Sequence, residues 1–360
     1  MVTRLGRLLS NEEHMANIRD VANHAEVSVS SVSNVLNNRT DQMRPETLER
    51  IRQSMLALNY QPNRIAQQLK TGQTRMIGLL VPSIVNPSFA MLTREVDRVA
   101  KANQYRVLLG NTYRQEDEER AFLGDMFAHG IKGVIVVATA MDRPHFAEAA
   151  RQGLVMVNYD SLMTGDSLNR NLPFDSVSMD NLAAGRLATE HLIQRGCRQL
   201  AFVTESSVTT SRLQKIEGFW VAAQAHGLQQ HARVIEGTAT VAYGDAEMTE
   251  LGRSLAAKIL QTSPRPDGVV AINDALGIGL MAGLRDANVR IPEDISVIGI
   301  DNIPLTDLVQ PPMSSVIPPL TDMVNMMMQR LLMRIENPKL KPEEFLFTPG
   351  LISRKSVNSG

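Results

Sequence analysis

Cysteine and long apolar runs are the clearest scarcities in this sequence. The single cysteine, Cys197, can form no intramolecular disulfide and cannot supply the several thiolates of a metal cluster, so a reducing compartment fits the chain. No apolar run is long enough to span a bilayer, and charged residues interrupt the first 14 residues, which lack the apolar core of a secretory signal. We expect a cytoplasmic protein with no membrane segment.

Catalytic signatures are equally scarce. The sequence has no Gly-rich loop ending in Lys and Ser or Thr, no Gly-x-Ser-x-Gly elbow and no histidine pair at zinc spacing. The glycines that begin at Gly277 have the wrong spacing for a dinucleotide fingerprint and predict helix packing. His191 is expected to be structural, and residues 116–120, EDEER, to form a solvated helix face. We therefore predict no enzyme, no cofactor and no metal.

What is present is a globular composition with an uneven distribution of charge. A chain of 360 residues can form two or three domains, and 43% hydrophobic with 21% charged residues is typical of a soluble protein. The formal net charge is −1, but eight basic side chains outnumber five acidic ones between residues 15 and 75. A nucleic-acid surface is therefore expected only in this first part of the chain.

Residues 18–37, IRDVANHAEVSVSSVSNVLN, predict a helix-turn-helix. Both helices carry an apolar stripe at helical spacing, formed by Val21, Ala22 and Ala25 in the first and by Val29, Val32, Val35 and Leu36 in the second. Ser28 is placed to cap the second helix, whose polar side chains are Ser30, Ser31, Ser33 and Asn34. Such a helix fits a DNA major groove, but an ordinary helical hairpin has the same spacing.

Strands alternate with helices after this head. A helix that starts at Pro45 closes the head, and a polar linker follows it. Continuous apolar runs then indicate parallel strands covered on both faces, at residues 76–82, 105–111, 133–139, 154–160, 199–204, 268–274 and 295–301. Seven strands exceed one compact sheet, and an irregular segment over residues 161–178 interrupts them. We predict a doubly wound α/β body of two lobes.

The cleft between the lobes is the expected ligand site, because ligands of such folds bind beyond the carboxyl ends of the strands. Polar residues stand at those ends: Asn86, Asp160, Asn273, Asp274 and Asp301. Asp274 directly precedes a helical run, so we interpret it as a helix cap. Asp160 and Asp301 precede no clear helix, and we expect both carboxylates to face the cleft.

The chain resembles the lactose-repressor family of bacterial transcription regulators over nearly its whole length. The matching segments, in the family's order, are 18–37, 59–74 (NYQPNRIAQQLKTGQT), 86–89 (NPSF), 178–196 (SMDNLAAGRLATEHLIQRG), 271–279 (AINDALGIG) and 291–304 (IPEDISVIGIDNIP). The resemblance implies a homodimeric, DNA-binding regulator, typically a repressor of a carbohydrate-use operon. It also implies a two-lobed body that resembles a periplasmic sugar receptor.

For the head, the resemblance implies that the second helix reads bases in the major groove of a palindromic operator. Residues 64–69 match a hinge helix whose leucine enters the minor groove and unstacks a base step; packing of that leucine against the core is the alternative. The predicted DNA-binding residues are Arg19, Ser28, Val29, Ser30, Ser31, Asn34, Asn37, Arg64, Gln67 and Leu69.

For the body, the resemblance implies three crossings between the lobes. One lobe would hold about residues 75–177 and 318–348, the other 178–317 and 349–360. A small effector, a sugar or a sugar derivative, would bind between them and change operator affinity, either as inducer or as corepressor. The predicted effector-binding residues are Asn86, Phe89, Asp160, Lys215, Asn273 and Asp301.

Several positions depart from the family's pattern. Asn34 stands where arginine is usual; arginine pairs with guanine and asparagine with adenine, so the operator is expected to differ there. Glu26 replaces a turn glycine and Arg44 a serine cap. Lys215 replaces an arginine, with a plain surface lysine as the alternative, and Pro318 indicates a less polar pocket.

The expected domains are therefore an extension over residues 1–15, a head over 16–62, a hinge and linker over 63–74 and a body over 75–360. The extension would be either disordered or the product of a misassigned start, since Met15 stands just before the head. A sugar receptor serving transport is the second hypothesis, but the head would then have no purpose. An enzyme, the third, would require a catalytic constellation in the cleft.

Overall fold

The computed structural model describes residues 16–36, 39–41, 43–61, 74–137, 143–160, 174–206, 209–238 and 248–358. The chain divides into two compact units, a head within residues 1–73 and a body over residues 74–360. Four predicted DNA-binding residues lie outside the described ranges, as does the predicted 1–15 extension: Asn37, Arg64, Gln67 and Leu69.

The described part of the head is a bundle of three short helices, α1 (Ile18–His24), α2 (Val29–Leu36) and α3 (Pro45–Ala57). α1 begins with a capping box, in which Asn17 Oδ1 accepts from the backbone N–H of Arg19 and the Asp20 carboxylate accepts from that of Asn17. The core common to the three helices is formed by Val21, Ala22, Ala25, Val32 and Ile51. The predicted helix-turn-helix is confirmed.

The turn into α2 has the predicted features. The Ser31 N–H donates to Ser28 Oγ at 3.1 Å, so Ser28 caps α2. Glu26 adopts a left-handed φ of 51°. Arg44 makes no side-chain cap, and Pro45 begins α3 instead.

The prediction that Val29 belongs to the buried apolar stripe of α2 is wrong. Val29 is 41% exposed, whereas Val32, one turn later, is fully buried. Val29 is the first residue of α2, and the α2 side chains that pack on the head's core come after it, at Val32, Val35 and Leu36. Its exposed methyl groups are therefore available to a partner rather than to the core.

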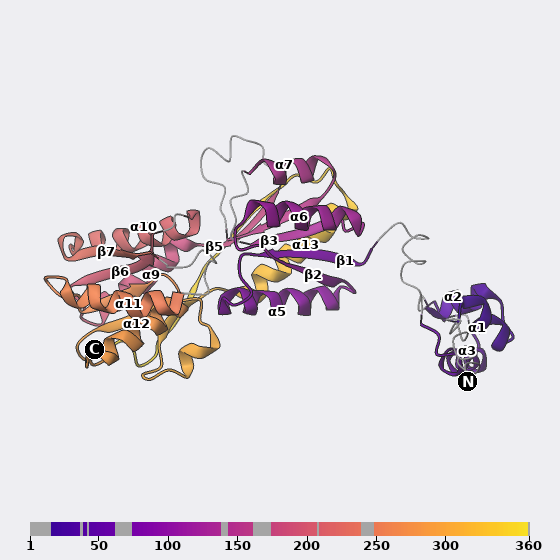
Figure 1. The fold of residues 1–360 in the computed structure, drawn as a ribbon, viewed down its shortest axis with the longest axis horizontal. Coiled ribbons are helices and arrows are strands. Elements are labelled where there is room, and N and C mark those ends of the chain that lie inside the picture. Colours follow the sequence, from indigo (N-terminus) through magenta and orange to yellow (C-terminus); the bar gives the residue numbers. More distant parts are fainter. Residues whose placement is uncertain are drawn as a thin grey trace, which may run out of the picture. The chain divides into compact units, whose positions relative to one another are not determined.

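The described part of the body contains two six-stranded sheets (Figure 1). The first sheet has the order β11-β5-β4-β3-β1-β2, all parallel, with β1 (Met76–Val81), β2 (Arg106–Asn111), β3 (Gly133–Val137), β4 (Val155–Tyr159), β5 (Asp175–Met179) and β11 (Glu344–Phe347). The second has the order β12-β10-β9-β8-β6-β7, with β6 (Leu200–Glu205), β7 (Ala232–Gly237), β8 (Gly268–Ala271), β9 (Ser296–Ile300), β10 (Ser314–Ile317) and an antiparallel β12 (Gly350–Ile352).

Each sheet is covered by helices on both faces, as predicted (Figure 1). In β1, Leu79 packs in the cluster that contains α5 (Pro87–Ala102) and α13 (Leu320–Glu336). The next residue, Leu80, packs in the cluster of α6 (Glu116–Ala128) and α7 (Pro144–Arg151). Successive strand residues point to opposite faces, so this continuous apolar run feeds two cores.

Helices of the second lobe approach one another through glycines. α9 (Asn181–Gln194) packs on α10 (Thr210–Ala225), and α11 (Met248–Gln261) packs on α12 (Asp274–Asp286). A Cβ on Gly279 would lie 1.8 Å from the Thr249 carbonyl oxygen, closer than any real contact. The predicted helix-packing role is confirmed for Gly279 and Gly283, whereas Gly277 packs against Ala271 of β8 and Met313. The described residues of this lobe also include the short 3-10 helices η1 (Gln229–His231) and η3 (Pro304–Asp307).

The chain crosses between the sheets three times, from β5 to α9, from β10 to α13 and from β11 to β12. No helix of the described residues is long and apolar enough to cross a membrane.

The segment predicted to be irregular over residues 161–178 ends in strand β5, so this expectation is wrong for its last residues. β5 reads DSVSM, which lacks an apolar run, yet all five residues are buried. Asp175 can be buried because Arg330 Nε and Arg334 Nη1 donate to its carboxylate at 2.9 and 2.8 Å. A pattern based on hydrophobicity misses such a core strand, because its polar side chains are buried together with partners inside the fold.

Candidate functional site

One cavity lies between the two lobes, and all six predicted effector-binding residues border it. Each comes from the carboxyl end of a strand or from the helix that follows one. The full lining is Asn86, Ser88, Phe89, Arg114, Tyr159, Asp160, Met179, Thr209, Ser211, Arg212, Lys215, Ile272, Asn273, Asp301 and Pro318. Whether these residues bind an effector stays a prediction at this point.

The first lobe places Asp160 on a strained backbone directly after β4. Its φ is 60°, a conformation that costs a non-glycine residue roughly 1 kcal/mol or more. The carboxylate accepts from Asn181 Nδ2 at 2.8 Å and from Ser178 Oγ at 3.4 Å, which orients it. Asn86 caps α5 by accepting the Ser88 N–H at 2.9 Å.

The second lobe places Asp301 in a comparable position directly after β9. Its φ is 119°, and its backbone N–H donates to the Val316 carbonyl at 2.8 Å. Left-handed backbone at non-glycine residues concentrates at functional sites, because the surrounding structure must hold it. Each lobe therefore contributes one carboxyl group to the cavity lining, and both groups stand on a left-handed backbone directly after a strand.

The interpretation of Asp274 as a helix cap is wrong. Asn273 caps α12, since its Oδ1 accepts the Leu276 N–H at 2.9 Å. Asp274 is the first helical residue and is fully buried; it accepts from Ser315 Oγ at 2.7 Å and from the Ile303 N–H at 2.8 Å. Its carboxylate thus fastens the loop that follows Asp301.

Burial dominates the electrostatics of the cavity. Desolvation raises the pKa of Asp301 to about 8, and the nearby charges of Asp274 and Asp160 act in the same direction. Lys215 and a hydrogen bond from Ser88 oppose the rise in the pKa of Asp301. Burial also raises the pKa of Tyr159 well above its usual value. At neutral pH, burial therefore favours the protonated form of the Asp301 carboxyl group.

Lys215 is buried, with 8% of its surface exposed, so the alternative of a plain surface lysine is wrong. Arg212 lies one turn earlier on α10 and forms a buried ion pair with Glu205. Pro318 adds an apolar contact, but charged side chains from both lobes line the cavity as well.

Sequence reasoning missed several lining residues, including Arg114, Tyr159 and Arg212. Arg114 follows the carboxyl end of β2, a strand that was predicted, so the rule that identified Asp160 could have found it. Arg212 precedes Lys215 by three residues, the spacing of neighbours on one helix face.

The described part of the predicted DNA-binding surface lies on α1 and α2. Arg19, Ser28, Val29, Ser30 and Asn34 are exposed, and Ser31 is half-buried. The Ser28 hydroxyl accepts the Ser31 N–H and lies 3.0 Å from the Ser31 hydroxyl, so the two hydroxyl groups bond to each other at the start of α2. Val29, Ser30 and Asn34 remain as a short, exposed set at the start and middle of α2.

Two other titratable groups, Cys197 and His191, do not line the cavity. Among the described residues no group of three or more His, Cys, Asp or Glu side chains could hold a metal ion. Burial raises the pKa of the Cys197 thiol to about 11 and lowers the pKa of His191.

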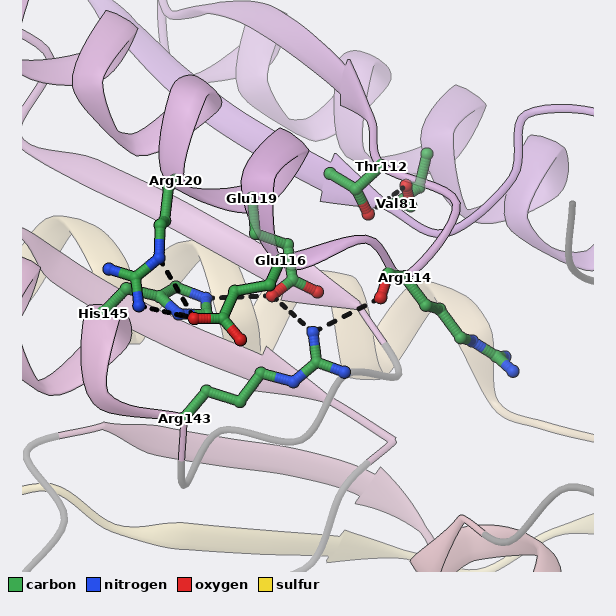
Figure 2. A network of polar contacts seen from close by, with 8 residues as sticks. All are labelled: Val81, Thr112, Arg114, Glu116, Glu119, Arg120, Arg143 and His145. Carbon is green, nitrogen blue, oxygen red and sulfur yellow. Dashed lines mark hydrogen bonds and ion pairs between the residues drawn. The ribbon is translucent and has the colours of Figure 1, made fainter. Parts of the chain in front are cut away.

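The predicted solvated face over residues 116–120 is wrong at Glu119, which is fully buried. Its carboxylate accepts from Arg143 and lies 2.9 Å from His145 Nε2, both on or beside α7 (Figure 2). The EDEER pattern could not reveal this partner, because Arg143 and His145 are more than 20 residues away.

Known proteins match both units of the chain. The model of the bacterial regulatory proteins of the lacI family matches residues 17–63, and that of the periplasmic binding protein-like domain matches residues 189–357. The ribose operon repressor of Halalkalibacterium halodurans is 32% identical over 346 residues, which cover 96% of this chain and 98% of that repressor. The chain belongs to the lacI family.

Solved structures of lacI-family proteins share the fold. A regulator from Enterococcus faecium with bound ribose has a TM-score of 0.68 and 26% identity, and the match covers 79% of this chain and 98% of that one. The lac repressor dimer bound to operator and the anti-inducer ONPF has a TM-score of 0.77 at 21% identity, covering 96% of this chain and 99% of that one. As a lacI-family member, the protein is a DNA-binding transcription regulator with an effector-binding body, and it is not an enzyme.

Proposed function

We propose that the protein represses a carbohydrate-use operon from the cytoplasm and that a pentose bound between the lobes controls its affinity for a palindromic operator. The observation that carries the proposal is the cavity with one carboxylate from each lobe, Asp160 and Asp301. Sugar hydroxyl groups bond well to carboxyl groups in either protonation state, and a ligand that bonds to both lobes favours one lobe arrangement over others.

Two comparisons favour a pentose. The ribose operon repressors of H. halodurans and of Escherichia coli are 32% and 30% identical to this chain over nearly its full length. The related E. faecium structure contains ribose. The lining amides Asn86 and Asn273 and the lining side chains Lys215 and Arg212 supply donors that complement the two carboxylates around a polyhydroxylated ligand.

On the DNA side, we propose that two copies of the chain present two heads to the two half-sites of the operator. Val29, Ser30 and Asn34 would read base edges, and Arg19 would contact phosphate. The exposure of these side chains on α1 and α2 supports these roles.

The single tryptophan makes the effector test direct. Trp220 lies on α10, the helix that carries Lys215 and Arg212, so its emission should report ligand binding in the unmodified chain. We expect D-ribose to shift Trp220 emission saturably and L-ribose, the mirror-image control, to do so far more weakly. Asp160→Asn should weaken D-ribose at least 10-fold, since a hydrogen bond to a charged group contributes about 1.5–3 kcal/mol.

The DNA test uses a palindrome selected from random duplexes by the full-length chain. Fluorescence anisotropy should show binding that weakens with salt and changes when D-ribose is added. Absence of specific binding with and without sugars would refute the regulator. Specific binding that ignores D-ribose would refute only the pentose.

A further inference from the structure

We propose that Arg114 is a specificity-determining residue of the effector cavity and that Arg143, Glu119 and His145 are positioning residues that hold its loop. The assignment rests on the proposed effector function of the cavity. It begins with the place of Arg114, three residues beyond the end of β2, where it borders the cavity opposite the residues of the second lobe.

The loop that carries Arg114 is strained. Tyr113 and Arg114 both have left-handed φ angles, 50° and 58°, and neither is glycine. Two such residues in succession persist only where the surroundings over-determine them. On the side of β1, the N–H groups of Thr112 and Tyr113 donate to the carbonyl groups of Val81 and Pro82 at 3.0 and 2.9 Å.

On the other side, an ion pair between the half-buried Arg143 and the fully buried Glu119 contacts the loop. Arg143 Nη1 donates to Glu119 Oε2 at 2.8 Å and to the Arg114 carbonyl oxygen at 3.4 Å (Figure 2). His145 Nε2 lies 2.9 Å from the same Glu119 oxygen, and the His145 side chain is buried. In Figure 2 the Arg114 side chain extends away from this cluster, so the cluster contacts the Arg114 backbone carbonyl, while the residue itself borders the cavity.

Stability alone does not account for a fully buried carboxylate. Desolvating Glu119 costs free energy that an ion pair commonly only offsets, and apolar side chains fill such places at least as well. What the cluster adds is a fixed direction for the Arg114 loop. A guanidinium is a rigid fork of donors, so the direction of its approach decides which pairs of ligand oxygens it can reach.

The chemistry that Arg114 would select is a pair of adjacent oxygens on the side of the sugar that faces the first lobe. A deoxy sugar that lacks one of them would leave part of the fork without an acceptor, and the site would reject it. Wild type should therefore discriminate between D-ribose and at least one of its 2-deoxy and 5-deoxy analogues, and Arg114→Ala should lose that discrimination.

A double-mutant cycle on the full-length chain tests the positioning. Arg114→Ala should weaken D-ribose about 10- to 100-fold, and Arg143→Ala about 3- to 10-fold, measured by Trp220 emission. In the Arg114→Ala background, Arg143→Ala should cost nothing further, because it acts through Arg114. Arg151→Ala, which breaks an exposed pair with Glu148 on α7, the helix that carries His145, is the matched control and should leave affinity unchanged.

General structural damage by Arg143→Ala would give a different result in this cycle from a loss of positioning. Additive losses from Arg114→Ala and Arg143→Ala, or unchanged affinity in Arg114→Ala, overturn the proposal. Hydrogen exchange of the Gln115 amide, which donates to the Thr112 carbonyl, should accelerate in Arg143→Ala and Glu119→Gln and not in Arg151→Ala. Unchanged exchange overturns the positioning.

Failure of the proposed pentose effector can be distinguished from failure of the proposed role of Arg114. If wild type ignores D-ribose, the pentose is wrong, and the Gln115 exchange still decides whether the cluster holds the loop. The affinity cycle then uses the member of an aldose and aldonic-acid panel that shifts Trp220 emission. If Arg114→Ala leaves that affinity unchanged, or if no member shifts the emission, the specificity role of Arg114 is refuted.

Discussion

A single exposed amide on α2 decides which base pair the head prefers, if the proposed recognition is correct. Asn34 is exposed and stands where family members usually carry arginine. Asn34→Arg should move the preference at the contacted position from adenine to guanine by about 1–3 kcal/mol, since each side chain matches a different pair of base-edge groups. Binding to a set of operators that differ at one base pair measures the shift.

The control for Asn34→Arg adds the same charge elsewhere on the head. Asn23 is exposed on α1, and Asn23→Arg should change affinity for every sequence alike. An Asn34→Arg variant that also changes all sequences alike would remove Asn34 from base recognition.

Asp301 should make the stability of the body depend on pH. Burial raises its pKa to about 8, whereas the unfolded carboxyl group has a value near 4. Between these values the folded chain binds the extra proton, so the stability contributed by Asp301 is lost as the pH rises through about 8. Asp301→Asn, which cannot ionise, should escape this loss.

Thermal unfolding at pH 5 and pH 9 tests the pH dependence. Asp301→Asn and wild type should melt close together at pH 5, and the variant should melt several degrees higher at pH 9, at about 2–4 °C per kcal/mol. Asp125→Asn, an exposed change on α6, should show no such difference. Equal gaps between Asp301→Asn and wild type at both pH values would contradict the raised pKa.

At the scale of elements, the contact between α11 and α12 depends on missing side chains. Cβ atoms on Gly279 and Gly252 would lie 1.8 and 2.0 Å from backbone oxygens of the facing helix. Backbone cannot yield as a flexible side chain can, so Gly279→Ala must force the helices apart and should destabilise the body by about 3 kcal/mol. Urea unfolding followed by Trp220 emission measures the change in the free energy of unfolding.

Gly124 provides the matched control for Gly279→Ala. It also lies within a helix, α6, but a Cβ there would meet nothing within 4 Å. Gly124→Ala should therefore stabilise the body by about 0.5–1 kcal/mol, because glycine loses more backbone entropy on folding than alanine. Equal effects at the two glycines would show that helix propensity, and not close packing, governs the α11–α12 contact.

The sequence could predict those strands whose residues form a continuous apolar run. β1, β3 and β9 are continuous apolar runs and were found. β5 was not, because Asp175 takes its partners, Arg330 and Arg334, from α13, more than 150 residues away. The same limit applies to Glu119, whose burial depends on distant α7.

The site residues likewise divide into those that the fold class places and those that depend on local detail. Asp160, Asn273 and Asp301 could be placed because the carboxyl ends of parallel strands converge, a property of the fold class. That Asn273 rather than Asp274 caps α12 depends on a one-residue difference in where the helix begins, which patterns do not resolve. Val29 and Val32 are likewise the same residue type on one helix, and only their packing neighbours make Val29 exposed and Val32 buried.

At the scale of the whole molecule, charge is segregated along the chain. Basic residues outnumber acidic ones over residues 15–75, whereas acidic residues outnumber basic ones in the rest. Phosphate attraction is therefore confined to the first part of the chain, and the body contributes repulsion that salt screens. Operator affinity should fall steeply with salt, with a slope set by the basic side chains of the head.

Arg19 separates this contribution from base reading. Arg19→Ala should weaken binding to all sequences and reduce the slope of log affinity against log salt by about 1 for each phosphate group that the head no longer neutralises. Arg151→Ala removes an exposed arginine from the body and should leave the slope unchanged. If both variants change the slope alike, the field of the whole chain, rather than direct binding of phosphates by the head, would govern its affinity for DNA.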